Sequence, residues 1–194
     1  MTETAQDGLP IKRFATQKSF ETWMERNHDK APGIWIKYAK KASGINTIAF
    51  AEALDVCLSY GWIDGQGKGL DETFYLQRYT PRRAKSKWSK INRDNVARLI
   101  KEGRMKPAGM RQIELAKADG RWDAAYDSPA NAKVPPDFQR ALNKNKKAKS
   151  FFETLNSANR YAFLYRIQDA KKPETRARRI EKFVEMLAAG EKLY

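Results

Sequence analysis

The sequence predicts an α+β fold, in which a small, mostly antiparallel sheet with helices is followed by an all-helical C-terminal module. Three observations predict this class. Runs of β-branched and aromatic residues that are typical of strands end at Pro81. Apolar residues recur at helical spacing between these runs and throughout the chain after Trp88. A loop-like stretch, 120–134, separates the two parts.

The expected domain organisation follows from these patterns. We expect a flexible tail over residues 1–12, an α+β domain with a basic segment over 13–128, and a helical module over 135–190. We find no internal repeat and no low-complexity tract beyond the basic runs.

In the N-terminal part, strands and helices are expected to alternate. A helix over 16–27 is predicted because Phe20, Trp23 and Met24 lie at positions i, i+3 and i+4. The glycine-rich run 61–72 is expected to be a connection, with a short strand around Trp62 and Ile63. The other expected elements are strands at 11–16, 34–41 and 73–80 and a helix at 47–60 that Gly61 ends.

In the C-terminal part, prolines and glycines mark the expected helix ends. Proline suits the first turn of a helix, and glycine suits the position just after its last turn. The expected helices are 92–102, 107–118, 135–142, 150–170 and a last one that begins at Pro173 and ends at Gly190.

Composition and charge narrow the function classes. The 194 residues are 41% hydrophobic and 11% aromatic, which argues against a disordered chain. The net charge is +15, and it is unevenly placed: residues 1–75 hold 9 Lys and Arg against 10 Asp and Glu, whereas residues 76–194 hold 29 against 13. A basic excess of this size favours an anionic partner, although a solvated charged face is the alternative.

Several chemistries are poorly supported. The single cysteine, Cys57, lies among apolar residues and is expected to be a buried structural thiol, so neither a disulfide nor a cysteine metal site is expected. The only histidine, His28, sits at an expected helix end, where the helix C-terminus explains it better than catalysis. We therefore expect no cofactor and no metal. Without an apolar run of membrane-spanning length or a signal-like core, we expect a soluble cytoplasmic protein.

The strongest candidate site is the basic segment that follows the strand at 73–80. Seven cations, Arg78 to Arg93, fall within sixteen residues, with Tyr79 and Trp88 between them. Arginine forks match phosphate and carboxylate oxygens, and Pro81 should hold the turn stiff. A solvated charged loop is the alternative. The residues expected to bind a ligand are Trp62, Asp64, Arg78, Tyr79, Arg82, Arg83, Lys87, Trp88 and Lys90.

Two further stretches could carry chemistry. The run 61–69, GWIDGQGKG, could turn backbone N–H groups toward an anion, but a structural turn with Asp64 as its cap is the alternative. An ion pair between Asp64 and one of the arginines could order a pocket. The basic run 144–149, with Arg176, Arg178 and Arg179, could attract nucleic acid, or it could form a solvated helix face.

Several phrases of the sequence resemble the YdeI/OmpD-associated family, also called bacteriocin-protection proteins. They are GWIDG, QRYTPRR and WSKIN, followed by GRWDAAYD, KVPPDFQRAL and ETRARRIEKFVEML. The resemblance implies a small soluble bacterial protein with an α+β N-terminal part, a helical C-terminal module and a link to bacteriocin tolerance. It implies no reaction and no catalytic residue. Direct capture of cationic peptides by so basic a chain is disfavoured, because like charges repel.

Three functional hypotheses follow. The first is a non-enzymatic stress-tolerance protein that binds a small anion or an acidic protein surface through the basic segment. The second is a non-specific nucleic-acid-binding protein. The third is an enzyme acting on a phosphorylated or carboxylated metabolite, with Asp64 as the acid–base group, which requires Asp64 to face a closed pocket beside the arginines. The sequence does not indicate an oligomeric state.

Overall fold

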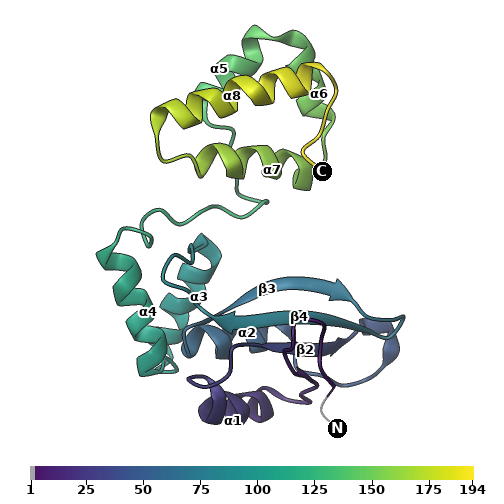
Figure 1. Cartoon of the computed structure of the whole chain (residues 1–194), viewed down its shortest axis with the longest axis vertical. Helices are drawn as coiled ribbons and strands as arrows, with labels where there is room; N and C mark the ends of the chain where they lie inside the picture. Colours follow the sequence, from purple (N-terminus) through teal and green to yellow (C-terminus); the bar gives the residue numbers. More distant parts are fainter. Residues whose placement is uncertain (1–2) are drawn as a thin grey trace. The chain divides into compact units, whose positions relative to one another are not determined.

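The computed structural model describes residues 3–194 and divides into two compact units. The N-terminal unit comprises the described residues up to 88 together with 92–124. The C-terminal unit comprises residues 89–91 and 125–194. Strands occur in the N-terminal unit, and the C-terminal unit carries helices, which confirms the expected α+β class with a helical module (Figure 1).

The N-terminal unit is built on a four-stranded sheet with the strand order β1-β2-β4-β3. The strands are β1 (Ile11–Lys12), β2 (Ile34–Ala39), β3 (Trp62–Gly69) and β4 (Phe74–Pro81). β4 pairs antiparallel with both β2 and β3, whereas β1 pairs parallel with β2. The sheet is therefore mixed. The parallel pair follows from connectivity, because the helix between β1 and β2 makes a crossover rather than a hairpin.

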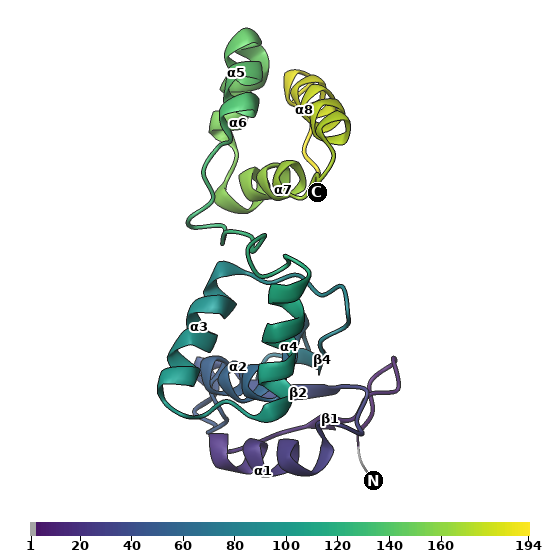
Figure 2. The same cartoon turned by 90° about the vertical axis from the view of Figure 1, so that its left-hand side faces the viewer.

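The helices of this unit begin and end where local sequence signals place them. They are α1 (Gln17–Asn27), the 3₁₀ helix η1 (Lys41–Ser43), α2 (Phe50–Ser59), α3 (Lys90–Lys101) and α4 (Pro107–Ala118). Thr16 caps α1 in a reciprocal capping box with Ser19. Buried side chains of α1, α2 and the sheet form one core, so these two helices cover one face of the sheet (Figure 2).

Residues 3–12, expected to belong to a flexible tail, cover part of the other sheet face instead. Leu9 is buried with Trp35 and Leu76. The Asp7 carboxylate accepts hydrogen bonds from the Trp35 indole at 3.0 and 3.1 Å. These contacts form because Leu9 and Asp7, within an otherwise polar segment, lie against the sheet face that carries Trp35 and Leu76. Residues 1–2 of the expected tail lie outside the described part.

Most of the glycine-rich run forms strand β3, rather than a connection. Its register shifts between Asp64 and Gly67, which marks a β-bulge. The Gln77 side chain donates a hydrogen bond to the Gly65 carbonyl at 2.8 Å, and a Cβ on Gly67 would meet the Gln77 Oε1 at 2.9 Å. Glycine at position 67 thus leaves room for the Gln77 side chain, a use that a glycine pattern does not distinguish from a turn.

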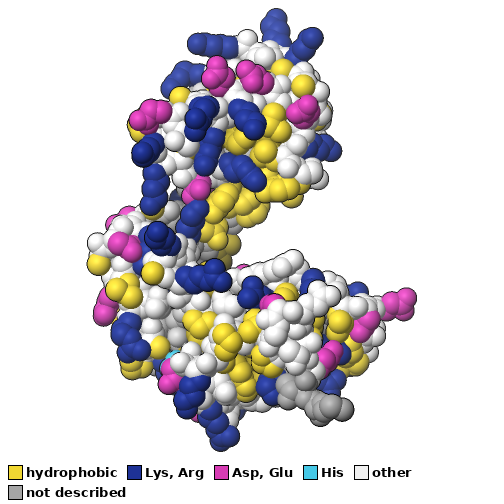
Figure 3. Space-filling model, viewed as in Figure 1, with side chains coloured by type: hydrophobic (Ala, Val, Ile, Leu, Met, Phe, Trp, Pro, Cys, Tyr) yellow, Lys and Arg dark blue, Asp and Glu magenta, His cyan; other side chains and the backbone are white. Residues whose placement is uncertain are grey.

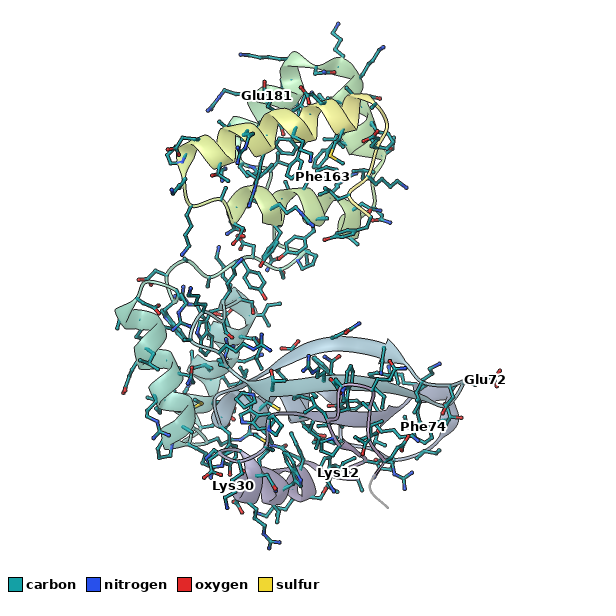
Figure 4. All side chains as sticks on the ribbon, in the orientation of Figure 1. Lys12, Lys30, Glu72, Phe74, Phe163 and Glu181 are labelled. Carbon is teal, nitrogen blue, oxygen red and sulfur yellow. The ribbon has the colours of Figure 1, made fainter. Side chains whose placement is uncertain are left out.

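The C-terminal unit consists of α5 (Pro136–Lys144), α6 (Lys146–Thr154), α7 (Ser157–Gln168) and α8 (Pro173–Ala188), with residues 89–91 beside its first loop. The single helix expected over 150–170 is divided, because Leu155 is extended and Asn156 caps the next helix by accepting from the Asn159 N–H. The buried aromatic centre includes Phe163, labelled in Figure 4. Among residues 3–194, no helix is long and apolar enough to cross a membrane.

Candidate functional site

The basic segment does not form a single cluster of cations. Arg78 on β4 lies near the N-terminal segment, with its Nε 3.3 Å from the Asp7 carboxylate. Arg83 is exposed, and its backbone N–H donates to the Ser86 hydroxyl at 2.9 Å. Lys87 is also exposed. The structure therefore distributes these cations among different partners.

Arg82 is the most buried cation of the segment, with 6% of its surface exposed. Its guanidinium lies 3.5 Å from the centroid of the Trp88 ring, and its Nη1 donates to the Lys87 carbonyl at 3.1 Å. Trp88 in turn meets Trp122 edge to face at 4.9 Å. Arg93 lies over the Trp122 ring and donates to the Trp122 carbonyl. We call these four residues the Arg–Trp stack.

Asp64 lies beside this stack and is half-buried in the bulged part of β3. Burial raises the pKa of the Asp64 carboxyl, against the opposing effects of its own backbone N–H, the Arg82 charge and the Asn92 side chain. The Asp64 carboxylate thus partly neutralises the Arg82 charge. Asp64 therefore has an arginine beside it, which is one of the two features that the acid–base hypothesis requires.

The aromatic members of the predicted site are core residues. Trp62 is 1% exposed, and its indole N–H donates to the His28 carbonyl at 3.0 Å. Tyr79 is fully buried, and its hydroxyl shares a 2.8 Å hydrogen bond with that of Tyr38. Burial raises the pKa of both hydroxyl groups well above their ordinary value. Neither ring is presented to a ligand.

Two other sequence expectations concern the single histidine and the single cysteine. His28 follows α1 as its C-cap, and its Nδ1 lies 3.0 Å from the Met24 carbonyl oxygen. Cys57 is fully buried, and burial raises the pKa of its thiol, which confirms the expected structural role. Across residues 3–194, no group of three or more His, Cys, Asp or Glu side chains could hold a metal ion.

Lys90 is the one predicted site residue that lines a described cavity, and it does so in the C-terminal unit. This cavity has a volume of about 390 Å³. Three cationic residues lie in its wall together with one carboxylate and two amides, over an apolar base. The lining residues are Lys90, Asp127, Asn131, Ala132, Lys133, Pro135, Leu164, Gln168 and Arg176. We call it the helical-unit cavity.

Arg176 is held firmly in the wall of this cavity. Its Nε and Nη2 donate to the two oxygens of Asp137 at 2.6 and 2.9 Å, and its Nη1 donates to the Ile167 carbonyl at 2.8 Å. The same hydrogen bonds lower the pKa of Asp137 and raise that of Arg176, so both groups stay charged. Three of the five guanidinium N–H groups are used in this way, and the remaining two are left to other acceptors.

The loop that forms the other wall is also anchored. Lys90 reaches the Asp127 carboxylate at 2.7 Å, and the Tyr161 hydroxyl donates to the Asp127 carbonyl at 2.7 Å. The Lys90 backbone N–H donates to the Tyr126 carbonyl at 2.9 Å. Lys133, by contrast, is exposed and has no ion-pair partner within the part of the chain that the structure describes. A cavity with fixed walls and an uncompensated lysine suits a small anion.

Sequence reasoning missed most of this cavity. Lys133, Asn131 and Gln168 are scattered polar residues of a loop and a helix end, and no local pattern distinguishes them. The sequence marks Arg176 only as one cation of a basic helix. The available signal was the boundary itself, since loops between helices often carry binding residues.

Comparison with known families divides the chain in two. Residues 12–112 match the model of a domain of unknown function (DUF8412), and residues 131–190 match the model described as Bacteriocin-protection, YdeI or OmpD-Associated. The phrases GWIDG, QRYTPRR and WSKIN thus fall within the first match, whereas most of the helical-unit cavity falls within the second. Searches among curated proteins and among solved structures found no significant match. The chain belongs to the family of this domain of unknown function, whose model covers more than half of it, and its residues 131–190 match the model of the YdeI/OmpD-associated bacteriocin-protection family.

Proposed function

We propose that this protein is a non-enzymatic stress-tolerance protein of the bacteriocin-protection type, which binds a small carboxylate- or phosphate-bearing ligand in the helical-unit cavity. The observation that carries the proposal is the pre-positioned Arg176, which shares the cavity wall with Lys133 and Lys90. A guanidinium that is already oriented loses little freedom when it binds an anion.

The lining favours an anion that also carries polar groups. Lys133 supplies an uncompensated charge, while the amides of Asn131 and Gln168 can donate or accept hydrogen bonds. Leu164 gives the cavity an apolar base that helps to exclude water. Lys90 is already paired with Asp127, so we expect it to contribute less to binding than Lys133.

The cavity gives no reason to invoke a reaction, because it combines cations and amides with a carboxylate that is already engaged by a lysine. Protection would then act through the bound anion or through a partner that senses it, since a basic protein repels cationic peptides. A cytoplasmic location remains part of this proposal.

Isothermal titration with citrate and with inorganic phosphate at low and moderate salt tests the binding step. We expect saturable binding of at least one probe, and Lys133→Ala should weaken it about tenfold because a charge-assisted hydrogen bond is lost. Lys171→Ala removes an exposed lysine of the same unit that does not line the cavity, and it should change the affinity less than about twofold. Absence of binding to either probe, or equal losses in both variants, would refute the proposal.

The link to protection needs a separate measurement. Bacteria that depend on this protein for bacteriocin tolerance should lose survival when it carries Lys133→Ala and keep it with Lys171→Ala. If the Lys133→Ala cells survive as well as those with the native chain, then anion binding in this cavity does not underlie protection, even where the titration has succeeded.

A second candidate, binding of nucleic acid, is favoured by one observation in the same unit. The end that carries α5 and α6 has no acidic residue between positions 138 and 152, and Lys and Arg side chains project from it (Figure 3). Its cations are Arg140, Lys144, Lys146, Lys147 and Lys149. A labelled oligonucleotide should then bind with an affinity that falls steeply with salt. The double substitution of Lys146 and Lys147 by Ala should flatten that salt dependence, and a lack of binding at low salt would eliminate this candidate.

A further inference from the structure

A second basic hollow lies in the N-terminal unit, far from the helical-unit cavity in sequence. It has a volume of about 450 Å³ and is open to solvent. The chain just after β1 forms one side of it, and one stripe of α1 forms the other (Figure 2; Lys12 is labelled in Figure 4). Its lining residues are Lys12, Arg13, Phe14, Ser19, Thr22, Trp23, Arg26 and Asn27. We call it the α1 groove.

The charges in the α1 groove are all positive. Lys12, Arg13 and Arg26 line it, and no carboxylate does. None of the three forms an ion pair with any described residue of the chain. They therefore repel one another, and a bound anion would relieve that repulsion.

The acidic residues of α1 face a different direction. Glu21 and Glu25 lie close enough to Tyr60 to raise the pKa of its hydroxyl, which burial together with these two charges brings to about 12. Residues 19, 22, 23 and 26 follow the helical spacing of one stripe, and residues 21 and 25 fall outside it. The helix thus separates its charges, with the cationic side in the groove.

One wall of the groove is an aromatic ring held in a fixed position. Trp23 is half-buried, and its ring stacks on Phe20 at 6.1 Å and meets Trp62 edge to face at 6.1 Å. Phe14 packs against the same ring at 6.4 Å. With three rings around it, the exposed part of Trp23 offers a rigid flat surface on which a second ring can stack.

The neutral polar side chains of the groove are already engaged within the helix. The Ser19 hydroxyl donates to the Thr16 carbonyl at 2.7 Å, and the Thr22 hydroxyl donates to the Lys18 carbonyl at 3.0 Å. The Asn27 amide donates to the Trp23 carbonyl at 2.6 Å. A neutral polyhydroxylated ligand would therefore find few open donors, whereas an anion would find three cations.

We propose that the α1 groove binds a small aryl anion, meaning a phosphate or carboxylate group attached to an aromatic or heteroaromatic ring. The ring would stack on Trp23, and the anionic group would lie among Lys12, Arg13 and Arg26. This site is independent of the helical-unit cavity, since the two share no residue.

The test uses NMR spectra of the full chain labelled with ¹⁵N and follows the indole N–H signals of the tryptophans. The signal that is missing from the spectrum of Trp23→Phe belongs to Trp23. The probes are phenyl phosphate, benzoate, inorganic phosphate and benzyl alcohol, so that phosphate and carboxylate sources and each half of the ligand are compared. We expect phenyl phosphate or benzoate to shift the Trp23 signal at concentrations about tenfold below those of inorganic phosphate or benzyl alcohol.

Arg26→Ala should weaken this binding about tenfold, because one charge-assisted contact is lost from an exposed position that does not support the core. Lys18→Ala removes another exposed cation of α1 that does not line the groove, and it should leave the affinity nearly unchanged. Lys133→Ala should also have no effect, which separates this site from the helical-unit cavity. Equal affinity for inorganic and phenyl phosphate, an unmoved Trp23 signal, or equal losses in Arg26→Ala and Lys18→Ala would overturn the proposal.

Discussion

Replacement of Arg82 by methionine should destabilise the N-terminal unit and leave anion binding unchanged. Methionine keeps most of the aliphatic volume and removes the guanidinium. The variant loses the contact with the Trp88 ring at 3.5 Å, the hydrogen bond to the Lys87 carbonyl and the charge that partly offsets Asp64. If Arg82 were instead the centre of an anion receptor, its removal would abolish binding.

The size of the effect follows from these contacts. A desolvated cation–π contact contributes about 2 kcal/mol, and removal of one partner from a buried charge pair costs about 3–5 kcal/mol. The two figures overlap, and Asp64 is only partly buried. We therefore expect the free energy of unfolding to fall by about 3 kcal/mol at neutral pH.

The pH dependence of stability shows how much of the loss in Arg82→Met arises from the Asp64 carboxylate. Because burial raises the pKa of the folded carboxyl above 3.8, the native state binds this proton more tightly than the unfolded state does. The contribution of Asp64 to stability therefore decreases as the pH rises from 3.8 through the raised value. Without Arg82 that pKa rises further, so the deficit of the variant should be larger at pH 7 than at pH 4.

Tryptophan fluorescence during urea unfolding measures this effect in the right unit. All five tryptophans, Trp23, Trp35, Trp62, Trp88 and Trp122, lie in the N-terminal unit. Arg83→Met is the matched control, since the neighbouring side chain is exposed, and it should change stability by less than about 0.5 kcal/mol. A change equally small in Arg82→Met, or a deficit independent of pH, would show that the guanidinium is not held as described.

Two other predictions concern packing and the second unit. Gly109→Ala should lower the free energy of unfolding by about 2 kcal/mol, because the added Cβ would collide with the Ser59 backbone carbonyl. Gly69→Ala is the control, since open space surrounds this position, and it should change stability by less than about 1 kcal/mol. Urea unfolding of the two variants measures both effects. Asp137→Asn should lose about 1 kcal/mol at neutral pH, a modest figure because both partners are about a third exposed. Arg176 holds the pKa of Asp137 below 3.8, so the stability that the native Asp137 adds should decrease as the pH falls below 3.8, and the loss in Asp137→Asn should shrink with it. Unfolding curves recorded by far-UV circular dichroism at several pH values measure this change.

The elements that the sequence predicts well are those with strong local signals. The helix at α1 is recognisable because Phe20 and Met24 face the core and Thr16 begins it with a capping box. The sequence predicts β3 only in its first residues, since its glycines are typical of turns, and the antiparallel pairing that makes this run a strand comes from β4. Local patterns report local preferences, and tertiary contacts decide the rest.

The division of the 150–170 region shows the same limit on a smaller scale. Apolar residues continue through the region at helical spacing, so periodicity alone predicts one helix. Asn156 is a good N-cap residue, and its side chain accepts from the Asn159 N–H to begin α7. The sequence contains this capping residue, but the residue alone does not show that a helix is interrupted there. The interruption also depends on the preceding residue, Leu155, whose side chain packs in the core.

We expect linear charge density to be a poor guide to where this protein binds an anion. Three of the seven cations of the basic segment lie beside a carboxylate: Arg78 meets Asp7, Arg82 lies beside Asp64, and Lys90 meets Asp127. Strands and loops bring these acids from positions that no local window includes. The cations left uncompensated in cavities are sparse in the sequence, such as Lys133 and Arg26. Because an anion responds to the local uncompensated charge and to desolvation, we expect it to bind in the two proposed hollows rather than on the basic run.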